Sequence, residues 1–331
     1  KQDVILEPMV AFLTLQLGGR PIKIDFSREE CMIGTRTRHP FDVKMRAGVN
    51  RDGTLVALDM DAVSNTGAYA SHGHSVAGAA GAKSRSLYPR SAVHYHARTV
   101  YTNTPTAGAM RAYGAPQVIF AVECIIEEAA RNIGMDPVEF RIKNVARQGD
   151  ADPLSGERFE SCGLVECLQK GKELIGWDKK RAAWPKKQSG PLRRGLGVAC
   201  FSYASGTYPA CMEIAGARII LNQDASLHIQ VGATEIGQGL DTIVAQMAAE
   251  TVGIPYANVH VVSTQDTDVA PFDTGAYASR QAYVASNAVF RAARELKAKI
   301  LEHAGRVTGK LGGELDILNS DIVDRKNPAR K

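Results

Sequence analysis

The sequence predicts an α+β protein made of two mixed α/β subdomains. Short apolar runs with strand-like alternation occur in groups, and longer segments with apolar residues at helical spacing follow them. A strict βαβ repeat would alternate strands and helices one by one, so an α+β arrangement fits the pattern better. A polar, proline-containing stretch separates two strand-bearing halves. We therefore divide the chain into a first subdomain (1–150), a linker with a short helix (151–194) and a second subdomain (195–331).

The N-terminal elements are predicted from apolar patterning and capping residues. Val4 to Leu17 is apolar on nearly every side and predicts a buried helix that ends at Gly18-Gly19. Residues 21–26 alternate and predict a strand. Ser27-Arg-Glu-Glu30 has the spacing of a capping box, which predicts a short helix to about Gly34.

The middle of the first half contains a hairpin and two helices. Residues 41–47 and 54–64 predict strands joined by a turn at Asn50-Arg-Asp-Gly53. Residues 68–82 are small, glycine-rich and poor in charge, which predicts a packed loop. Apolar residues at helical spacing predict a helix over 116–133, and Asp136-Pro137 predicts a capped helix through about Asn144.

The second half is expected to be rich in strands. One helix is predicted in the linker at 164–175. The predicted strands lie at 197–203, 212–221, 227–231 and 259–264, with a hairpin turn at 222–225. Helices are predicted at 240–252 and 281–304. No internal repeat is evident in the sequence. The segment after Asp321 contains no recognisable closing element, and the chain opens on Lys1, so we expect a fold that is incomplete at both ends.

Composition excludes several classes of function. The net charge of +5 over 331 residues, without a continuous basic face, argues against nucleic-acid binding. No apolar run is long enough for a membrane span, and no signal peptide is visible. The six cysteines form no CxxC pair, so we expect reduced thiols, a cytoplasmic protein and no zinc or iron–sulfur site on this chain.

Two glycine-bracketed segments carry the functional signal, namely residues 108–117 (GAMRAYGAPQ) and 232–239 (GATEIGQG). Glycine lets the main chain approach a ligand closely, with N–H groups directed at anionic oxygens. Each segment leads into a predicted helix, whose N-terminus favours an anion such as phosphate. Two such loops predict a large anionic cofactor.

Together with three further segments, these motifs carry a family resemblance. The segments are Lys1-Gln-Asp3, Arg36-Thr-Arg38-His-Pro40 and Asp273-Thr-Gly-Ala-Tyr-Ala-Ser-Arg-Gln281. In this order, over about residues 1–305, they resemble the molybdenum hydroxylase large subunit, in particular the bacterial xanthine dehydrogenase molybdenum-binding type. The resemblance implies a molybdenum–molybdopterin cofactor whose metal is held by the pterin, so no side chain of this chain is expected to ligate metal.

The same resemblance implies roles for individual residues around the pterin. Arg111 and Ala112 correspond to positions near the molybdenum end, and an ordinary surface arginine is the alternative for Arg111. Gln238 corresponds to a glutamine that contacts the cofactor, and a turn-capping amide is its alternative. The full set of expected cofactor-binding residues is Arg111, Ala112, Gly237, Gln238, Gly239, Gly275, Ala276, Ser279 and Arg280. An ordinary helix N-cap would explain part of the pattern at Ser279.

Three residues are expected on the substrate side. Arg38 resembles an arginine that stabilises negative charge on the substrate, with a helix-terminal salt bridge as the alternative. Tyr113 stands where relatives usually have a phenylalanine that stacks on a flat substrate, and a core aromatic is the alternative. Gln2 falls where purine-oxidising relatives often place a glutamate, and it is expected to contact the substrate without supplying charge.

The resemblance also implies a catalytic glutamate that this chain does not match. The family places that base in a Gly-Glu-Pro-like motif, whereas Gly156-Glu157 and Gly313-Glu314 lack the proline. Glu235 lies near the glutamine turn, where a structural role is favoured. We therefore expect the isolated chain to be inactive and to need partner subunits that carry FAD and 2Fe-2S centres in a hetero-oligomer. Hydroxylation of a purine or related N-heterocycle is the favoured activity. Oxidation of another heterocycle or an aldehyde, and a non-catalytic scaffold, stay open.

Overall fold

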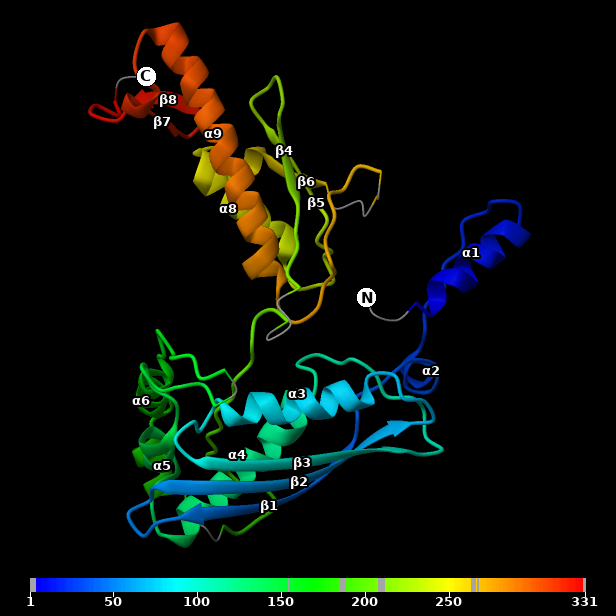
Figure 1. The fold of residues 1–331 in the computed structure, drawn as a ribbon, viewed down its shortest axis with the longest axis vertical. Helices are drawn as coiled ribbons and strands as arrows, with labels where there is room; N and C mark the ends of the chain where they lie inside the picture. The colour runs from blue at the N-terminus through cyan, green and yellow to red at the C-terminus, as the bar shows by residue number, and fades with distance from the viewer. Residues whose placement is uncertain are drawn as a thin grey trace. The chain divides into compact units, whose positions relative to one another are not determined.

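The computed structural model describes residues 4–153, 155–184, 188–207, 212–262, 266 and 268–329. The chain divides into two compact units, one essentially of residues 2–203 and the other of residues 204–331 (Figure 1). Both units combine helices with small sheets, which confirms the predicted α+β class. In the described part of the chain, no helix has the length and apolar character needed to cross a membrane.

The sheet of the first unit has the strand order β1-β2-β3. β1 (Phe41–Val49) and β2 (Leu55–Gly67) form the predicted antiparallel hairpin, and β3 (Ala92–Tyr101) lies parallel to β2. The connection between β2 and β3 runs through α3 (Gly73–Arg85), which lies along one face of the sheet (Figure 1). α4 (Ala115–Asn132) contacts both α3 and β1, so the two helices cover the same face.

A single apolar core joins these helices to the sheet. Alternate residues of β2 point into it, including Leu58 and Met60, and α4 contributes Val118, Val122 and Ile126. The opposite face of the sheet is charged: His94 and His96 of β3 bond to Asp59 and Asp61 of β2. One apolar and one solvated face explain why the hairpin could be predicted from alternation alone.

Two helices of this unit begin with the N-terminal caps that the sequence predicted. α2 (Arg28–Gly34) begins with the predicted capping box, in which Ser27 and Glu30 exchange side-chain to backbone hydrogen bonds. α5 (Pro137–Asn144) begins at Asp136, whose carboxylate accepts from the N–H groups of Val138 and Glu139. Both caps use short-range bonds, so local sequence was sufficient to predict them.

Several predictions for the first unit were wrong. α1 (Leu6–Gln16) is a helix, but none of its residues is buried in this chain. Residues 21–26 form no strand, and β3 was not predicted. Residues 73–85 form α3 rather than a loop, because small residues let this helix lie close to β3: a Cβ on Gly81 would be 2.2 Å from the Tyr95 ring.

The segment predicted as a linker contributes to the core of the first unit. It contains α6 (Leu164–Ile175), as expected, and also α7 (Trp177–Ala183). Leu168 and Trp177 are buried in the same apolar cluster as α4, and the Trp177 indole N–H donates to Asp136 at 3.0 Å. The polar composition of this stretch reflects its outer face.

The second unit repeats the order of elements seen in the first. β4 (Ala217–Leu221) is antiparallel to β5 (Leu227–Val231), the predicted turn joins them, and β6 (Val259–Val262) is parallel to β5. α8 (Leu240–Val252) connects β5 to β6, as α3 connects β2 to β3. A π-helical turn (Gln281–Ala285) then leads into the long helix α9 (Ser286–Thr308).

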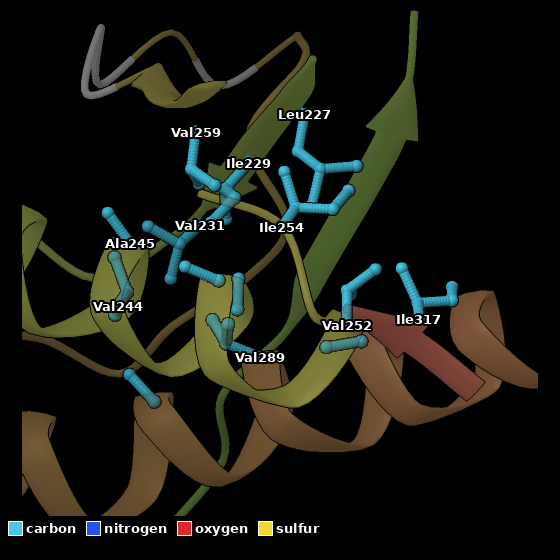
Figure 2. Packing of buried hydrophobic residues seen from close by; sticks show 14 of the residues in the cluster. Leu227, Ile229, Val231, Val244, Ala245, Val252, Ile254, Val259, Val289 and Ile317 are labelled. Atoms are coloured by element: carbon cyan, nitrogen blue, oxygen red, sulfur yellow. The ribbon is translucent and has the colours of Figure 1, made fainter. Parts of the chain in front are cut away.

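The core of this unit lies between its sheet and the helices α8 and α9. Leu227, Ile229 and Val231 of β5 pack with Val244 and other residues of α8 (Figure 2).

Predicted strands at 197–203 and 212–216 do not form, and residues 263 and 264 lie outside the described residues. After a 3₁₀ turn (Gly312–Glu314), β7 (Leu315–Leu318) and β8 (Asp321–Asp324) form a hairpin, which was not predicted.

The structure also corrects the view that the chain has no internal repeat. Each unit follows the order strand, strand, helix, parallel strand, long helix. Each long helix is entered from a similar heptapeptide, Arg111-Ala-Tyr-Gly-Ala-Pro-Gln117 in the first unit and Gly275-Ala-Tyr-Ala-Ser-Arg-Gln281 in the second. The two segments that resemble a cofactor-binding family therefore occupy equivalent places in two copies of one motif.

Candidate functional site

The first glycine-bracketed segment forms a tight turn against α3. Ala112, Tyr113 and Gly114 have positive φ angles of 69°, 41° and 88°. Gly114 is the N-cap of α4, and a Cβ on it would lie 2.4 Å from the carbonyl oxygen of Val76 in α3. A glycine is required here both by the backbone angle and by the close approach.

Arg38 and Arg111, which are far apart in sequence, meet at this turn. The Arg38 guanidinium donates through Nη2 to the Arg111 carbonyl at 2.9 Å, while its buried Nη1 has no hydrogen-bond partner. Burial lowers the pKa of Arg38 from its usual range. Among the described residues Arg38 makes no ion pair, so the helix-terminal salt bridge considered for it is not seen. The side chain of Arg111 itself is exposed.

Tyr113 is half-buried and its hydroxyl has a defined partner. The hydroxyl lies 2.7 Å from Nδ1 of His72, and the two rings meet edge to face with centroids 5.7 Å apart. Burial raises the pKa of Tyr113. His72 precedes α3, and no local pattern in the sequence linked it to Tyr113. The ring is thus held in one orientation next to Arg111.

In the second glycine-bracketed segment, the carboxylate of Glu235 binds the backbone N–H groups of the segment itself. Glu235 Oε1 accepts from the N–H groups of Gly237 and Gly239 at 2.6 and 3.1 Å, and Oε2 accepts from Asp241 at 3.2 Å. Desolvation acts to raise the pKa of Glu235, but these backbone donors hold it below its usual range. The expectation that these N–H groups are open to an external anion was wrong, because Glu235 caps the N-terminus of α8.

Replacing Glu235 with glutamine is expected to loosen this turn. An amide offers one acceptor oxygen where the carboxylate offers two, so the N–H groups of Gly237, Gly239 and Asp241 lose part of their bonding. Hydrogen exchange followed by mass spectrometry should be faster over 236–241 in Glu235→Gln than in the matched exposed variant Glu295→Gln. Lowering the pH through the depressed pKa of Glu235 should reduce amide protection, measured against the intrinsic exchange rate at each pH, in the parent but not in the variant. Equal exchange in all three proteins would rule out this capping role.

Gln238 caps its own turn and also reaches the neighbouring loop. Its side-chain oxygen accepts from the Ile236 N–H at 2.6 Å, and its Nε2 donates to the Thr234 carbonyl at 2.9 Å and to Oε1 of Gln281. The turn-capping alternative is therefore realised. Gln238 remains exposed, so the same amide lies at the surface of the loop.

The 273–281 loop is organised around the buried side chain of Arg280. Its guanidinium bonds to Glu213, to Asp273 at 2.6 Å, and to the carbonyls of Gly275 at 3.1 Å and Ile214 at 2.5 Å. The side chain is fully buried and supports the loop, and the cofactor contact expected of Arg280 stays a prediction. Glu213 was not identified from the sequence, since it lies 67 residues from Arg280.

Other residues of the 273–281 loop are small, and several have positive φ, so a ligand could approach the backbone closely. Gly275, Ala278 and Ser279 have positive φ angles of 130°, 50° and 52°. Ser279 is exposed, and the following π-helical turn has no side-chain cap, so the N-cap alternative for Ser279 is not realised. Ala276 is half-buried. Gln2 lies outside the described residues.

Unpaired buried polar atoms gather at these loops. In the first unit they include Nη1 of Arg38 and Oε1 of Gln117, which follows the Arg111 turn. In the second unit they include Oγ1 of Thr274, Nε2 of Gln281 and Oγ of Ser286, at the same loop and helix start. Buried polar groups are rarely left unpaired, so this set fits a ligand rich in oxygen and nitrogen.

The other candidate catalytic and metal-binding residues do not form a site in the part of the chain that the structure describes. Glu157 and Glu314 are exposed, and the Glu314 carboxylate accepts from Leu311 in its own turn. Within the residues that the structure describes, no group of three or more His, Cys, Asp or Glu side chains is placed to hold a metal ion. The residues brought together are thus Arg38, Arg111 and Tyr113 in one unit, and Gln238 with the 273–281 loop in the other.

Known proteins share both units of this chain. Two family models described as molybdopterin cofactor-binding domains match residues 1–145 and 170–330. The xanthine dehydrogenase molybdenum-binding subunit of Escherichia coli O157:H7 is 56% identical over 99% of this chain. The aldehyde oxidoreductase molybdenum-binding subunit PaoC of E. coli K12 is 30% identical over 90% of it.

Solved structures show the same fold. Quinoline 2-oxidoreductase from Pseudomonas putida 86 aligns over 98% of this chain with a TM-score of 0.81 and 24% sequence identity. The chain spans 44% of the xanthine dehydrogenase subunit, 39% of PaoC and 42% of the quinoline enzyme chain. Both described units are therefore found together inside longer proteins.

Proposed function

The chain belongs to the molybdopterin cofactor-binding family, and on that premise we propose that it is the cofactor-holding part of a xanthine dehydrogenase-like molybdenum hydroxylase. The reaction proposed is oxidation of a purine or related N-heterocycle with oxygen taken from water. The molybdenum–pterin group supplies the redox chemistry when bound. Electrons pass to partner subunits that carry 2Fe-2S and FAD centres, in a cytoplasmic hetero-oligomer without nucleic-acid or membrane contacts.

The observation that carries the proposal is the placement of unpaired buried polar atoms at the family's loop motifs. Thr274 and Gln281 have such atoms in the second unit, and Arg38 has one in the first. Hydroxyl and amide donors suit phosphate and pterin oxygens, and a guanidinium donor suits an oxygen of the substrate. A scaffold that retained these loops for packing alone would satisfy its polar atoms internally.

Each loop residue has a specific proposed task. Gly237, Gln238 and Gly239 form one contact surface for the cofactor, and Gly275, Ala276 and Ser279 form another. In the first unit, Arg111 and Ala112 are proposed as cofactor contacts. The Arg280 side chain supports the second surface from below. The boundaries 1–150, 151–194 and 195–331 remain our proposed functional division of the chain.

Arg38 and Tyr113 are proposed to act on the substrate. The Arg38 guanidinium uses Nη2 on the Arg111 carbonyl, which leaves Nη1 to donate toward negative charge that develops on a ring oxygen. The Tyr113 ring, held by His72, offers a flat stacking surface. Gln2 would add an uncharged polar contact. The proton-abstracting glutamate is proposed to lie outside this chain, so the chain alone should be inactive.

The test uses the complete purified complex. Pterin and molybdenum are expected in about equimolar amounts with this chain, together with hydroxylation of a purine. Replacing Arg38 by methionine should lower kcat/KM by roughly 10²-fold and leave molybdenum content unchanged, because the lost interaction forms in the transition state. Arg46→Met, in an exposed pair with Asp59, is the matched control. A complex without molybdenum and pterin would overturn the catalytic proposal in favour of a scaffold.

Oxidation of another heterocycle or an aldehyde is the second candidate. It is favoured by the Tyr113 hydroxyl and its bond to His72, which place a polar group at the edge of the stacking surface. A substrate panel on the same complex, with purines, quinoline-type rings and aromatic aldehydes, separates the two. Higher kcat/KM for an aldehyde than for every purine would replace the purine assignment.

A further inference from the structure

Lys83, near the end of α3, bonds to the backbone of the Arg111 turn. Its ammonium lies 3.3 Å from the carbonyl oxygens of both Ala112 and Tyr113. The same nitrogen lies 4.2 Å from the ring centroid of Tyr203 and 5.6 Å from that of Tyr113. One cation thus contacts two consecutive carbonyls and two aromatic rings.

The two carbonyls belong to residues in an unfavourable conformation. Ala112 and Tyr113 both have positive φ, which residues with a Cβ seldom adopt. Such segments persist when the surrounding structure over-determines them. Gly114 fixes the far end of the turn against α3, and the Lys83 ammonium binds its middle. The Ala112 carbonyl also accepts from the Ala115 N–H at 3.0 Å, so Lys83 adds a donor from a neighbouring helix to a turn that already has one local bond.

Lys83 is not engaged by a carboxylate in the described part of the chain. It is half-buried beside Tyr113 and Tyr203, and burial lowers its pKa to about 8. The Ser202 hydroxyl donates to the Lys83 main-chain oxygen at 2.6 Å, which keeps the Tyr203 segment next to α3. A surface lysine held by an ion pair would have neither this burial nor these partners.

We infer that Lys83 is a positioning residue for the proposed cofactor and substrate loop. It holds the Ala112 and Tyr113 carbonyls against α3, so that Arg111 and the face of Tyr113 are presented outward. His72 fixes the other end of the Tyr113 side chain through its hydroxyl. The inference rests on the proposed function for its catalytic consequence, but the loop geometry can be measured without activity.

The test compares Lys83→Met and Lys83→Arg in the complete complex. Methionine keeps the apolar stem and removes the donors, whereas arginine keeps donors for two carbonyls. For Lys83→Met we expect KM for a flat heterocycle to rise about tenfold, with kcat per molybdenum within about threefold of the parent. Lys83→Arg should restore KM to within about threefold. Lys44→Met, on the exposed face of β1, is the control.

Hydrogen exchange supplies a second readout that does not depend on turnover. The Tyr113 N–H donates to Met110 and the Ala115 N–H to Ala112, so both report on the turn. We expect exchange over 110–116 to be at least about tenfold faster in Lys83→Met and near the parent rate in Lys83→Arg. Unchanged exchange and KM in a Lys83→Met complex that contains molybdenum would overturn the inference alone. Absence of molybdenum and pterin from the parent would overturn the proposed function, with the exchange result still deciding the role of Lys83.

Discussion

Replacing Arg141 with methionine is expected to destabilise the first unit by about 3–5 kcal/mol, because it leaves a buried carboxylate without its cation. Arg141 is completely buried on α5, and its Nε donates to Glu123 of α4 at 2.8 Å. Glu123 also accepts from the Tyr88 hydroxyl at 2.6 Å and from the Cys200 N–H at 2.8 Å. The pair thus connects α4, α5 and two other segments of the unit.

Urea unfolding followed by hydrogen exchange over residues 115–144 measures the effect in the unit concerned. Arg98→Met is the matched control, because Arg98 lies 3.5 Å from Asp61 on the exposed sheet face and should contribute less than about 1 kcal/mol. The double variant Arg141→Met/Glu123→Leu should recover part of the loss, since it removes the uncompensated charge. A loss below about 1 kcal/mol for Arg141→Met would show that the Glu123 carboxylate is compensated by its other partners, Tyr88 and Cys200.

Local signals allowed much of the fold to be predicted. The Ser27 capping box and the Asp136 cap depend on residues three or fewer positions away, and α4 shows its apolar face over 18 residues. α3 gave no such signal, because its buried side consists of small residues and a single valine, Val76. Its helical state is favoured by the fit of Gly81 under the Tyr95 ring, a contact that does not exist until β3 is in place.

The candidate site, like the fold, could be predicted only where the signal is local in the sequence. Motif resemblance placed Arg111, Tyr113 and Gln238 on loops that carry unpaired polar atoms or exposed side chains. It could not reveal what holds those loops, because the partners lie far away in sequence. Lys83 is about 30 positions from the carbonyls it binds, and Glu213 is 67 positions from Arg280. The supporting residues become visible when the turn conformation and burial are known.

The repeated order of elements explains why two motifs were found at all. Each heptapeptide joins a parallel strand to a long helix, and each contains the Ala-Tyr pair at the turn. Their support differs: a lysine from a neighbouring helix binds the first turn, and an arginine within the second turn binds its own loop. The repeat was not evident from the sequence, whereas the order and pairing of the elements show it.

Replacing Arg280 with methionine is expected to unfold the 273–281 loop and reduce the molybdenum and pterin content of the complex by more than about tenfold. The substitution removes every bond from the guanidinium to Glu213, Asp273, Gly275 and Ile214. Because the Asp273 side chain is 1% exposed, its charge would be left buried, which costs about 3–5 kcal/mol. Arg218→Met, whose guanidinium bonds to Gln230 on the exposed sheet surface, is the control.

The pH dependence of the loop provides an independent check on this arrangement. Desolvation acts to raise the pKa of Glu213, but the bonds from Thr207 and Arg280 hold it below the usual range for glutamate. A carboxyl whose pKa is depressed by folding contributes stability above its unfolded pKa and loses that stability as the pH falls through the folded value. Protection of the amides over 273–281, measured against the intrinsic exchange rate at each pH, should therefore fall in the parent as the medium becomes acidic, and change less in Arg280→Met, where the chief cationic partner is already absent. Parallel pH profiles in the two proteins would show that Arg280 does not set the ionisation of Glu213, and the loop would then have to be held by its backbone bonds alone.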